Sequence, residues 1–145
     1  MNKALQKLKA LKDVYQDFEE VTVGKDLNVK LRLLSSEEET EVHTYSVEKY
    51  EQSIGFLYSV KRETLCRAIV SMNGEEIPEI VEDEDANGKP EKIMRYIWLR
   101  ENIVKGWNQM LVDEIWKGYS ALMTKVETKI NGGIKKEKND EEDKE

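Results

Sequence analysis

Apolar residues recur every three or four positions between Val47 and Met72, and this spacing is the strongest constraint on what the chain can fold into. An α-helix has 3.6 residues per turn, so residues spaced in this way lie on one face. That face contains Tyr50, Ile54, Leu57, Tyr58, Leu65, Ala68, Ile69 and Met72. The segment is predicted to form one long helix with a buried face, which Asn73-Gly74 caps at its C-terminus.

A second apolar stripe runs through the first twenty residues. Its members are Leu5, Leu8, Leu11, Tyr15 and Phe18. Residues 1–20 are therefore predicted to form an amphipathic helix, with its lysines on a solvated face. A terminal helix of this kind can dock on another chain, so these five side chains are candidate partner-binding residues.

The next segment alternates apolar and polar residues. Val21 and Val23 precede a Gly24-Lys25-Asp26 turn, and apolar residues at every second position from Leu27 to Leu33 follow it. This pattern predicts a β-hairpin with one buried face. Because an isolated hairpin is marginal in water, that face is expected to lie on the helices or beside another strand.

A helix start follows directly on the hairpin. Ser35 or Ser36 can accept a hydrogen bond from a free amide of the first turn, while Glu38 or Glu39 reaches back to the serine amide. Successive glutamates at this end also suit the partial positive charge of a helix N-terminus. Helix initiation therefore explains the acidic residues of this stretch.

The single histidine and the single cysteine limit the chemistry that the chain can carry. A metal site around His43 would need further ligands, and only carboxylates and Cys66 are available. One cysteine excludes an internal disulfide, and a buried structural thiol is the expected state of Cys66. No phosphate-binding loop, zinc motif, nucleophile elbow or dinucleotide fingerprint occurs in the sequence. We expect no catalytic, cofactor-binding or metal-binding residues.

The second half of the chain is predicted to hold an acidic loop and two further helices. The loop covers residues 75–91, a helix covers Lys92 to Val104, and Asn108 can cap a last helix that reaches about Ile130. The three tryptophans, Trp98, Trp107 and Trp116, fall in this helical pair. An aromatic core is their usual role, but aromatic residues are also enriched in interfaces, so all three are candidate partner-binding residues.

These segments together predict a mainly α-helical α+β protein with four to five helices and a small β-hairpin. Residues 1–20 form the amphipathic helix, residues 21–130 form the hairpin plus a helical domain, and residues 131–145 form a charged tail. The tail carries almost no apolar residues, so burial cannot offset the entropy lost on ordering, and we expect an acidic, disordered C-terminus.

Net charge narrows the classes of partner. Thirty acidic against twenty-three basic residues give a formal charge of -7. Binding to nucleic acid or to an anionic membrane needs clustered lysines and arginines, so neither is expected. No apolar run approaches the ~20 residues that span a bilayer. The sequence instead favours a soluble, unexported protein that acts through protein contacts, with self-association among them.

The order of segments resembles the small tail proteins of tailed bacteriophages, which include tail assembly chaperones and baseplate hub or tail-completion components. The resemblance spans roughly residues 20–127 and rests on the stretches LRLLSSEEE, LCRAIVSMNGEEI and MLVDEIWKGYSALMTKVE. The matching positions are Ser35, Glu38 and Glu39 at the helix start, Met72 to Ile77 in the segment with Asn-Gly, and Val112, Asp113 and Tyr119 in the last helix. The long acidic loop and the charged tail depart from the compact members of this group.

The resemblance implies a non-enzymatic role in building a phage tail. A chaperone would hold tube, tape-measure or baseplate hub proteins in the host cytoplasm before they assemble, whereas a permanent minor structural subunit would remain in the virion. None of the matching positions is catalytic in such proteins. A third hypothesis, a small metal-dependent enzyme that uses His43 and nearby glutamates, follows from the residues alone.

Overall fold

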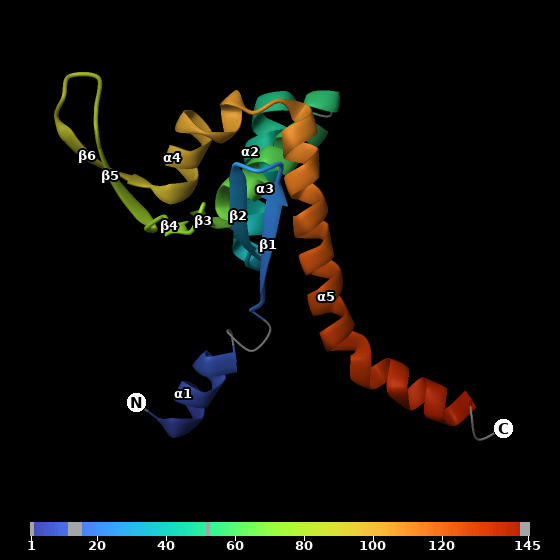
Figure 1. Ribbon diagram of the computed structural model, residues 1–145. Helices are drawn as coiled ribbons and strands as arrows, with labels where there is room; N and C mark the ends of the chain where they lie inside the picture. Colours follow the sequence, from blue (N-terminus) through green and yellow to red (C-terminus); the bar gives the residue numbers. More distant parts are fainter. Residues whose placement is uncertain (1, 12–15, 52, 143–145) are drawn as a thin grey trace.

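The computed structural model describes residues 2–11, 16–51 and 53–142 and shows a mainly helical α+β protein (Figure 1). The predicted fold class is thereby confirmed. In chain order the elements are α1 (Lys3–Ala10), β1 (Phe18–Val23), β2 (Leu27–Arg32), α2 (Ser36–Tyr50), α3 (Ile54–Ala68), β3 (Ile69–Met72), β4 (Glu75–Glu76), β5 (Ile80–Glu84), β6 (Pro90–Met94), α4 (Arg95–Asn102), a 3-10 turn η2 (Val104–Gly106) and α5 (Gln109–Glu142).

The predicted β-hairpin is present and forms half of a larger sheet. β1 and β2 pair in antiparallel register, with Val21 opposite Val29, around a turn at Gly24. β3 adds to the free edge of β2 and β4 pairs with β3, so the four-stranded sheet has the order β1-β2-β3-β4. The extra strands supply the partner that an isolated hairpin needs.

The core lies between this sheet and the helices. α5 packs along β1 and β2, and α3 packs against β2, β3 and α5 (Figure 1). The fully buried large side chains come from both layers: Val29, Leu31, Leu65, Ile69, Leu99, Val104, Val112, Ile115 and Leu122. Alternation along β2 and helical spacing along α5 therefore meet in one apolar cluster.

The prediction of one long helix from Val47 to Met72 is wrong. α2 ends at Tyr50, Glu51 has a φ of 51°, and α3 begins at Ile54. The two helices fold back on each other, so the buried hydroxyls of Ser46 and Ser59 lie 2.9 Å apart. In this helical hairpin α2 packs on α3, and α3 packs against β2 and β3 of the sheet.

The end of that segment is also different from the prediction. Ile69–Met72 forms β3, and the Asn73-Gly74 pair makes the turn into β4. Both residues have positive φ, 51° and 81°, as a helix cap would also require. The left-handed conformation was therefore predicted correctly, but two such residues in succession also make the tightest hairpin turn.

The N-terminal helix is shorter than predicted. α1 ends at Ala10, and Phe18–Val23 is strand β1, so residues 18–20 pair with β2 instead of continuing a helix. Strand pairing satisfies the backbone of this segment while it places Val21 and Val23 against the core. Tyr15, the fourth residue of the predicted stripe, lies outside the described residues.

The segment predicted as an acidic loop forms a second hairpin. β5 and β6 pair with each other and project from the rest of the molecule (Figure 1). The Asp85 carboxylate caps their turn by accepting from the amides of Asn87 and Lys89, and Gly88 has a φ of 78°. The helix predicted from Lys92 therefore begins only at Arg95, since Lys92 and its neighbours belong to β6.

The last helix begins as predicted and is longer. Asn108 Oδ1 accepts from the Leu111 amide at 2.9 Å, and α5 continues past Ile130 to Glu142. The disorder expected for residues 131–145 in solution stays a prediction, and residues 143–145 lie outside the described part of the chain.

The predicted start of α2 is confirmed as a capping box. Ser35 Oγ accepts from the Glu38 amide at 3.2 Å, and Glu38 Oε1 accepts from the Ser35 amide at 3.0 Å. Arg32 adds two hydrogen bonds to the same carboxylate, at 2.8 and 2.6 Å. Partial burial works against ionisation of Glu38, but the bonds from Arg32 and Ser35 outweigh it and lower the pKa of this carboxyl.

Replacing Ser35 by alanine is expected to lower the free energy of unfolding by about 1 kcal/mol, because the Glu38 amide loses its acceptor. Ser36→Ala is the matched control, since the cap bonds of α2 use Ser35 and Glu38. Urea denaturation followed by circular dichroism measures both. Equal effects of the two substitutions would contradict the assignment of Ser35 as the cap.

Candidate functional site

The predicted partner-binding residues of the N-terminal segment that the structure describes are exposed. Leu5, Leu8 and Leu11 each expose more than half of their surface, and no residue of α1 is buried. Phe18 lies apart from them on β1, where the Lys30 ammonium sits 4.6 Å from its ring centroid. The structure therefore leaves the leucines of α1 without an intramolecular partner among the described residues, and it places Phe18 on the sheet.

The three tryptophans lie in three different surroundings, and each is half-buried. Trp98 on α4 donates from Nε1 to Asp83 Oδ2 at 2.9 Å, which ties the β5–β6 hairpin to α4. Trp107 follows η2 and packs against the core. Trp116 on α5 lies beside the Tyr119 ring, with centroids 5.3 Å apart. Only Trp116 borders the surface described next.

A continuous apolar surface covers the outer side of the α2–α3 hairpin and the adjoining part of α5. We call it the α2–α3 surface and define it by His43, Val47, Ile54, Phe56, Leu57, Val60, Trp116 and Met123. Ile54 is 69% exposed and Leu57 60%, which is unusual for residues of this size. Three adjoining hollows of about 310, 480 and 540 Å³ lie along it, and His43 lines all three.

The break between α2 and α3 creates this surface. In a single long helix, Ile54 and Leu57 would share one face with Leu65 and Ala68. In the folded hairpin, Leu65 and Ala68 are buried in the core, whereas Ile54 and Leu57 lie near the turn and face solvent. Sequence reasoning missed the surface, although one signal was present. Five apolar residues in the seven positions from 54 to 60 exceed what a single buried stripe holds.

His43 lies among apolar neighbours. Its ring meets the Phe56 ring edge-on, with centroids 5.3 Å apart and planes at 85°. Among the described residues, no three His, Cys, Asp or Glu side chains are grouped so that they could hold a metal ion. His43 therefore lies in an apolar contact with Phe56.

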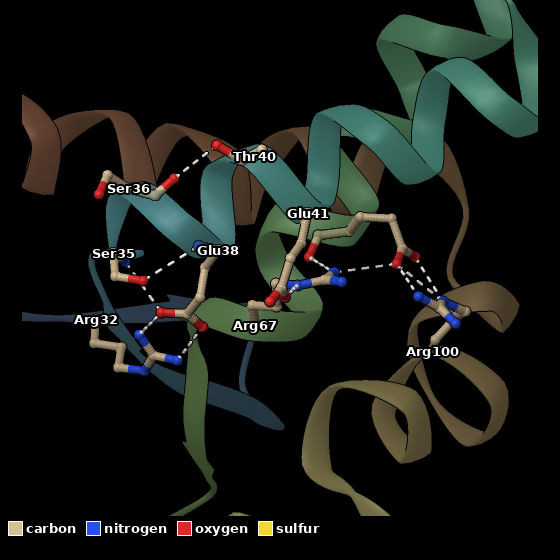
Figure 2. A network of polar contacts seen from close by, with 9 residues as sticks. Arg32, Ser35, Ser36, Glu38, Thr40, Glu41, Arg67 and Arg100 are labelled. Atoms are coloured by element: carbon tan, nitrogen blue, oxygen red, sulfur yellow. Dashed lines mark hydrogen bonds and ion pairs between the residues drawn. The ribbon is translucent and has the colours of Figure 1, made fainter.

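A buried ionic network joins α2, α3 and α4 (Figure 2). Glu63 is only 3% exposed and accepts from Arg67 Nη1 at 3.2 Å and from Arg100 Nε at 2.9 Å. Arg100 Nη2 also donates to Glu63, and this bond raises the pKa of the Arg100 guanidinium. Glu41 on α2 lies 3.5 Å from Arg67 Nε. The network clamps the helices together.

Aromatic rings cover the guanidinium groups of this network. Arg67 Cζ lies 4.1 Å from the Tyr96 ring centroid, and Arg100 Cζ lies 4.2 Å from the Tyr45 ring centroid. Such stacking stabilises a guanidinium that has lost water. The charges of this network therefore hold the fold together.

Cys66 is fully buried, as expected for a structural thiol. Burial and the nearby Glu63 charge raise the pKa of the thiol to about 12. Since the thiolate is the reactive form, Cys66 stays protonated at neutral pH and is not an activated nucleophile.

Two further observations complete the description. Within the described residues, no helix is both long and apolar enough to cross a membrane. No protein-family model, curated protein or solved structure matches this chain.

Proposed function

We propose that this chain is a bacteriophage tail-assembly protein of the chaperone type, which binds other tail proteins and catalyses no reaction. The α2–α3 surface carries the proposal, because it exposes two large aliphatic side chains, Ile54 and Leu57, beside preformed hollows. Contiguous apolar patches with a polar rim are typical of protein–protein contact sites. The resemblance of the sequence to phage tail proteins supplies the biological context.

The energetics favour a partner that covers this surface. Full burial of one Leu or Ile side chain contributes roughly 1.5–3 kcal/mol. Ile54 and Leu57 are mainly exposed in the isolated chain, so most of this burial free energy is gained only when a partner covers them. A partner gains it at little cost in ordering, because α2 and α3 are already packed together and joined by the Ser46–Ser59 hydroxyl bond and the Glu41–Arg67 ion pair.

The shape of the surface suits a helix from the partner. Its hollows follow the crossing of α2, α3 and α5, and an amphipathic helix presents apolar side chains at the matching three- and four-residue intervals. The partners that we propose are tube, tape-measure or baseplate hub proteins in the host cytoplasm. The leucines of α1 form a second apolar face for the same role.

The test is a double substitution, Ile54→Glu with Leu57→Glu, in a binding measurement by calorimetry against the purified tube, tape-measure and hub proteins encoded with this chain. We expect binding to weaken at least about 30-fold, because each anchor residue of an interface contributes more than about 1 kcal/mol. The fold should be retained, since both side chains are exposed and a glutamate at position 54 suits the N-terminus of α3.

Met110→Glu is the matched control, because Met110 is 76% exposed on α5 and lies outside the α2–α3 surface. It should leave binding unchanged. If the double variant binds as tightly as the unmodified chain, the surface is not the contact site and the proposal fails. Loss of binding by Met110→Glu alone would place the contact elsewhere.

The alternative of a permanent virion subunit makes a different prediction about particles. A chaperone should be absent from purified virions, whereas a subunit should be present at a fixed ratio to the other tail proteins. Quantitative mass spectrometry of purified particles distinguishes the two.

A further inference from the structure

Three arginines line one hollow of about 390 Å³ on the side of the molecule where β2, α3 and α4 meet. We call it the arginine pocket. The residues that line it include Arg32, Arg67, Arg95, Glu38, Glu79 and Tyr96. Such a concentration of guanidinium groups stands out in a chain whose net charge is -7.

Two of these arginines are already paired with carboxylates. Arg32 makes a bidentate pair with Glu38, at 2.8 and 2.6 Å. Arg67 pairs with Glu63 at 3.2 Å and lies near Glu41 (Figure 2). The Arg67 Nε is buried and makes no hydrogen bond, although the Glu41 carboxylate lies 3.5 Å from it. A buried donor of this kind costs about 1–3 kcal/mol when it is left unsatisfied.

Arg95 is the arginine without an ion-pair partner. Its Nη1 donates to the carbonyl of Ile77 at 2.9 Å, and among the described residues no carboxylate lies within 4.0 Å of it. Burial and the charge of Arg32 lower the pKa of Arg95, so its surroundings disfavour its positive charge. Glu79 acts on Arg95 only at longer range and is itself exposed.

We propose that the arginine pocket binds an oxyanion, either a carboxylate or a phosphate, with Arg95 as its principal ligand and the Arg67 Nε–H as a second donor. A guanidinium presents two parallel N–H groups that match the two oxygens of such an anion. The anion supplies the negative charge that Arg95 lacks. The arginine pocket shares no lining residue with the α2–α3 surface, so the test of this proposal is separate from the test of the proposed function.

The experiment follows the arginine Nε–H signals of the full chain by NMR during titration with sodium phosphate and, separately, with sodium glutarate. Sodium chloride at equal ionic strength is the reference. We expect the Arg95 and Arg67 signals to shift and saturate with at least one of the two anions. Saturation by phosphate alone or by glutarate alone identifies the preferred oxyanion, and either result supports the site.

Arg95→Gln should weaken the saturating anion at least tenfold. The matched control is Arg62→Gln, because Arg62 is half-buried, bonds the Tyr50 hydroxyl and lies outside the arginine pocket. Arg95→Lys serves if Arg95→Gln does not fold, since it keeps the charge and removes the planar fork. Shifts that do not exceed those with chloride, or equal weakening by Arg95→Gln and Arg62→Gln, would overturn the proposal.

Discussion

Glu63→Ala is expected to lower the free energy of unfolding by about 3–5 kcal/mol, because it leaves two guanidinium groups without their shared carboxylate in the protein interior. Arg67 is nearly as buried as Glu63 itself, and its remaining neighbour, the Glu41 carboxylate, makes only a long ion pair of 3.5 Å. Arg100 loses every hydrogen bond that it makes to a described carboxylate. Urea denaturation followed by circular dichroism at 222 nm measures the loss.

Two further substitutions separate burial from charge in this prediction. Glu114→Ala removes an ion pair whose side chains are both more than half exposed, so it should change stability by less than about 1 kcal/mol. Glu63→Gln keeps the side-chain volume and one acceptor oxygen, so its loss of unfolding free energy should lie between those of Glu63→Ala and Glu114→Ala. If Glu63→Ala costs no more than Glu114→Ala, the network is screened by solvent and does not clamp the helices.

Gly118→Ala is expected to destabilise the protein by about 1–3 kcal/mol, although alanine is the better helix former. Gly118 lies where α5 crosses β1, and a Cβ atom there would stand 2.0 Å from Val21 Cγ2. Because valine is branched at Cβ and stiff, the methyl group cannot simply turn away. The helix or the strand must shift, and thermal or urea unfolding will report that cost.

The same helix offers a control and a rescue for this substitution. Gly132→Ala meets no atom within 4 Å, so it should leave stability unchanged or raise it by up to about 1 kcal/mol. Val21→Ala should suppress the effect of Gly118→Ala in the double variant, because it removes the methyl group that clashes. A double variant as unstable as the sum of the two single changes would contradict the close contact.

The elements predicted correctly are those with short-range causes. The hairpin around Gly24 follows from alternation and a turn within some twelve residues, and the capping box at Ser35 needs only a serine and Glu38 three positions later. Asn108 likewise caps α5 through the Leu111 amide. In each case the groups that interact are neighbours in the chain, so the pattern of residues contains the interaction.

Some missed elements had local signals that were interpreted as something else. Two of the three Asn-Gly pairs, Asn73-Gly74 and Asn87-Gly88, make hairpin turns, whereas Asn131-Gly132 lies within α5. The sequence pattern predicts a helix cap at the first pair and an acidic loop around the second. The strands around Asp83 are not predicted from the sequence because many of their residues are charged. In a projecting two-stranded hairpin most side chains are exposed, so the sequence shows little apolar–polar alternation.

Only part of the candidate site could be predicted from the sequence. Trp116 is one of the predicted partner-binding residues and borders the α2–α3 surface, whereas the sequence pattern predicts a buried face for Ile54 and Leu57, which are exposed. Which apolar residues stay outside depends on where α2 turns into α3. Gly55 is the local signal for that turn, since a Cβ atom there would lie 2.9 Å from the Tyr50 ring, but the packing of α2 on α3 decides which apolar side chains remain exposed.

The sequence by itself determined the helical α+β class, the first hairpin and the starts of α2 and α5, because these depend on neighbouring residues and on composition. Only the tertiary structure decided that Glu63 on α3 pairs with Arg100 on α4, that a Cβ atom at Gly118 would clash with Val21, and that three arginines from separate elements line one pocket. These contacts link residues far apart in the chain. Their geometry is set by the packing of whole elements, which no local pattern encodes.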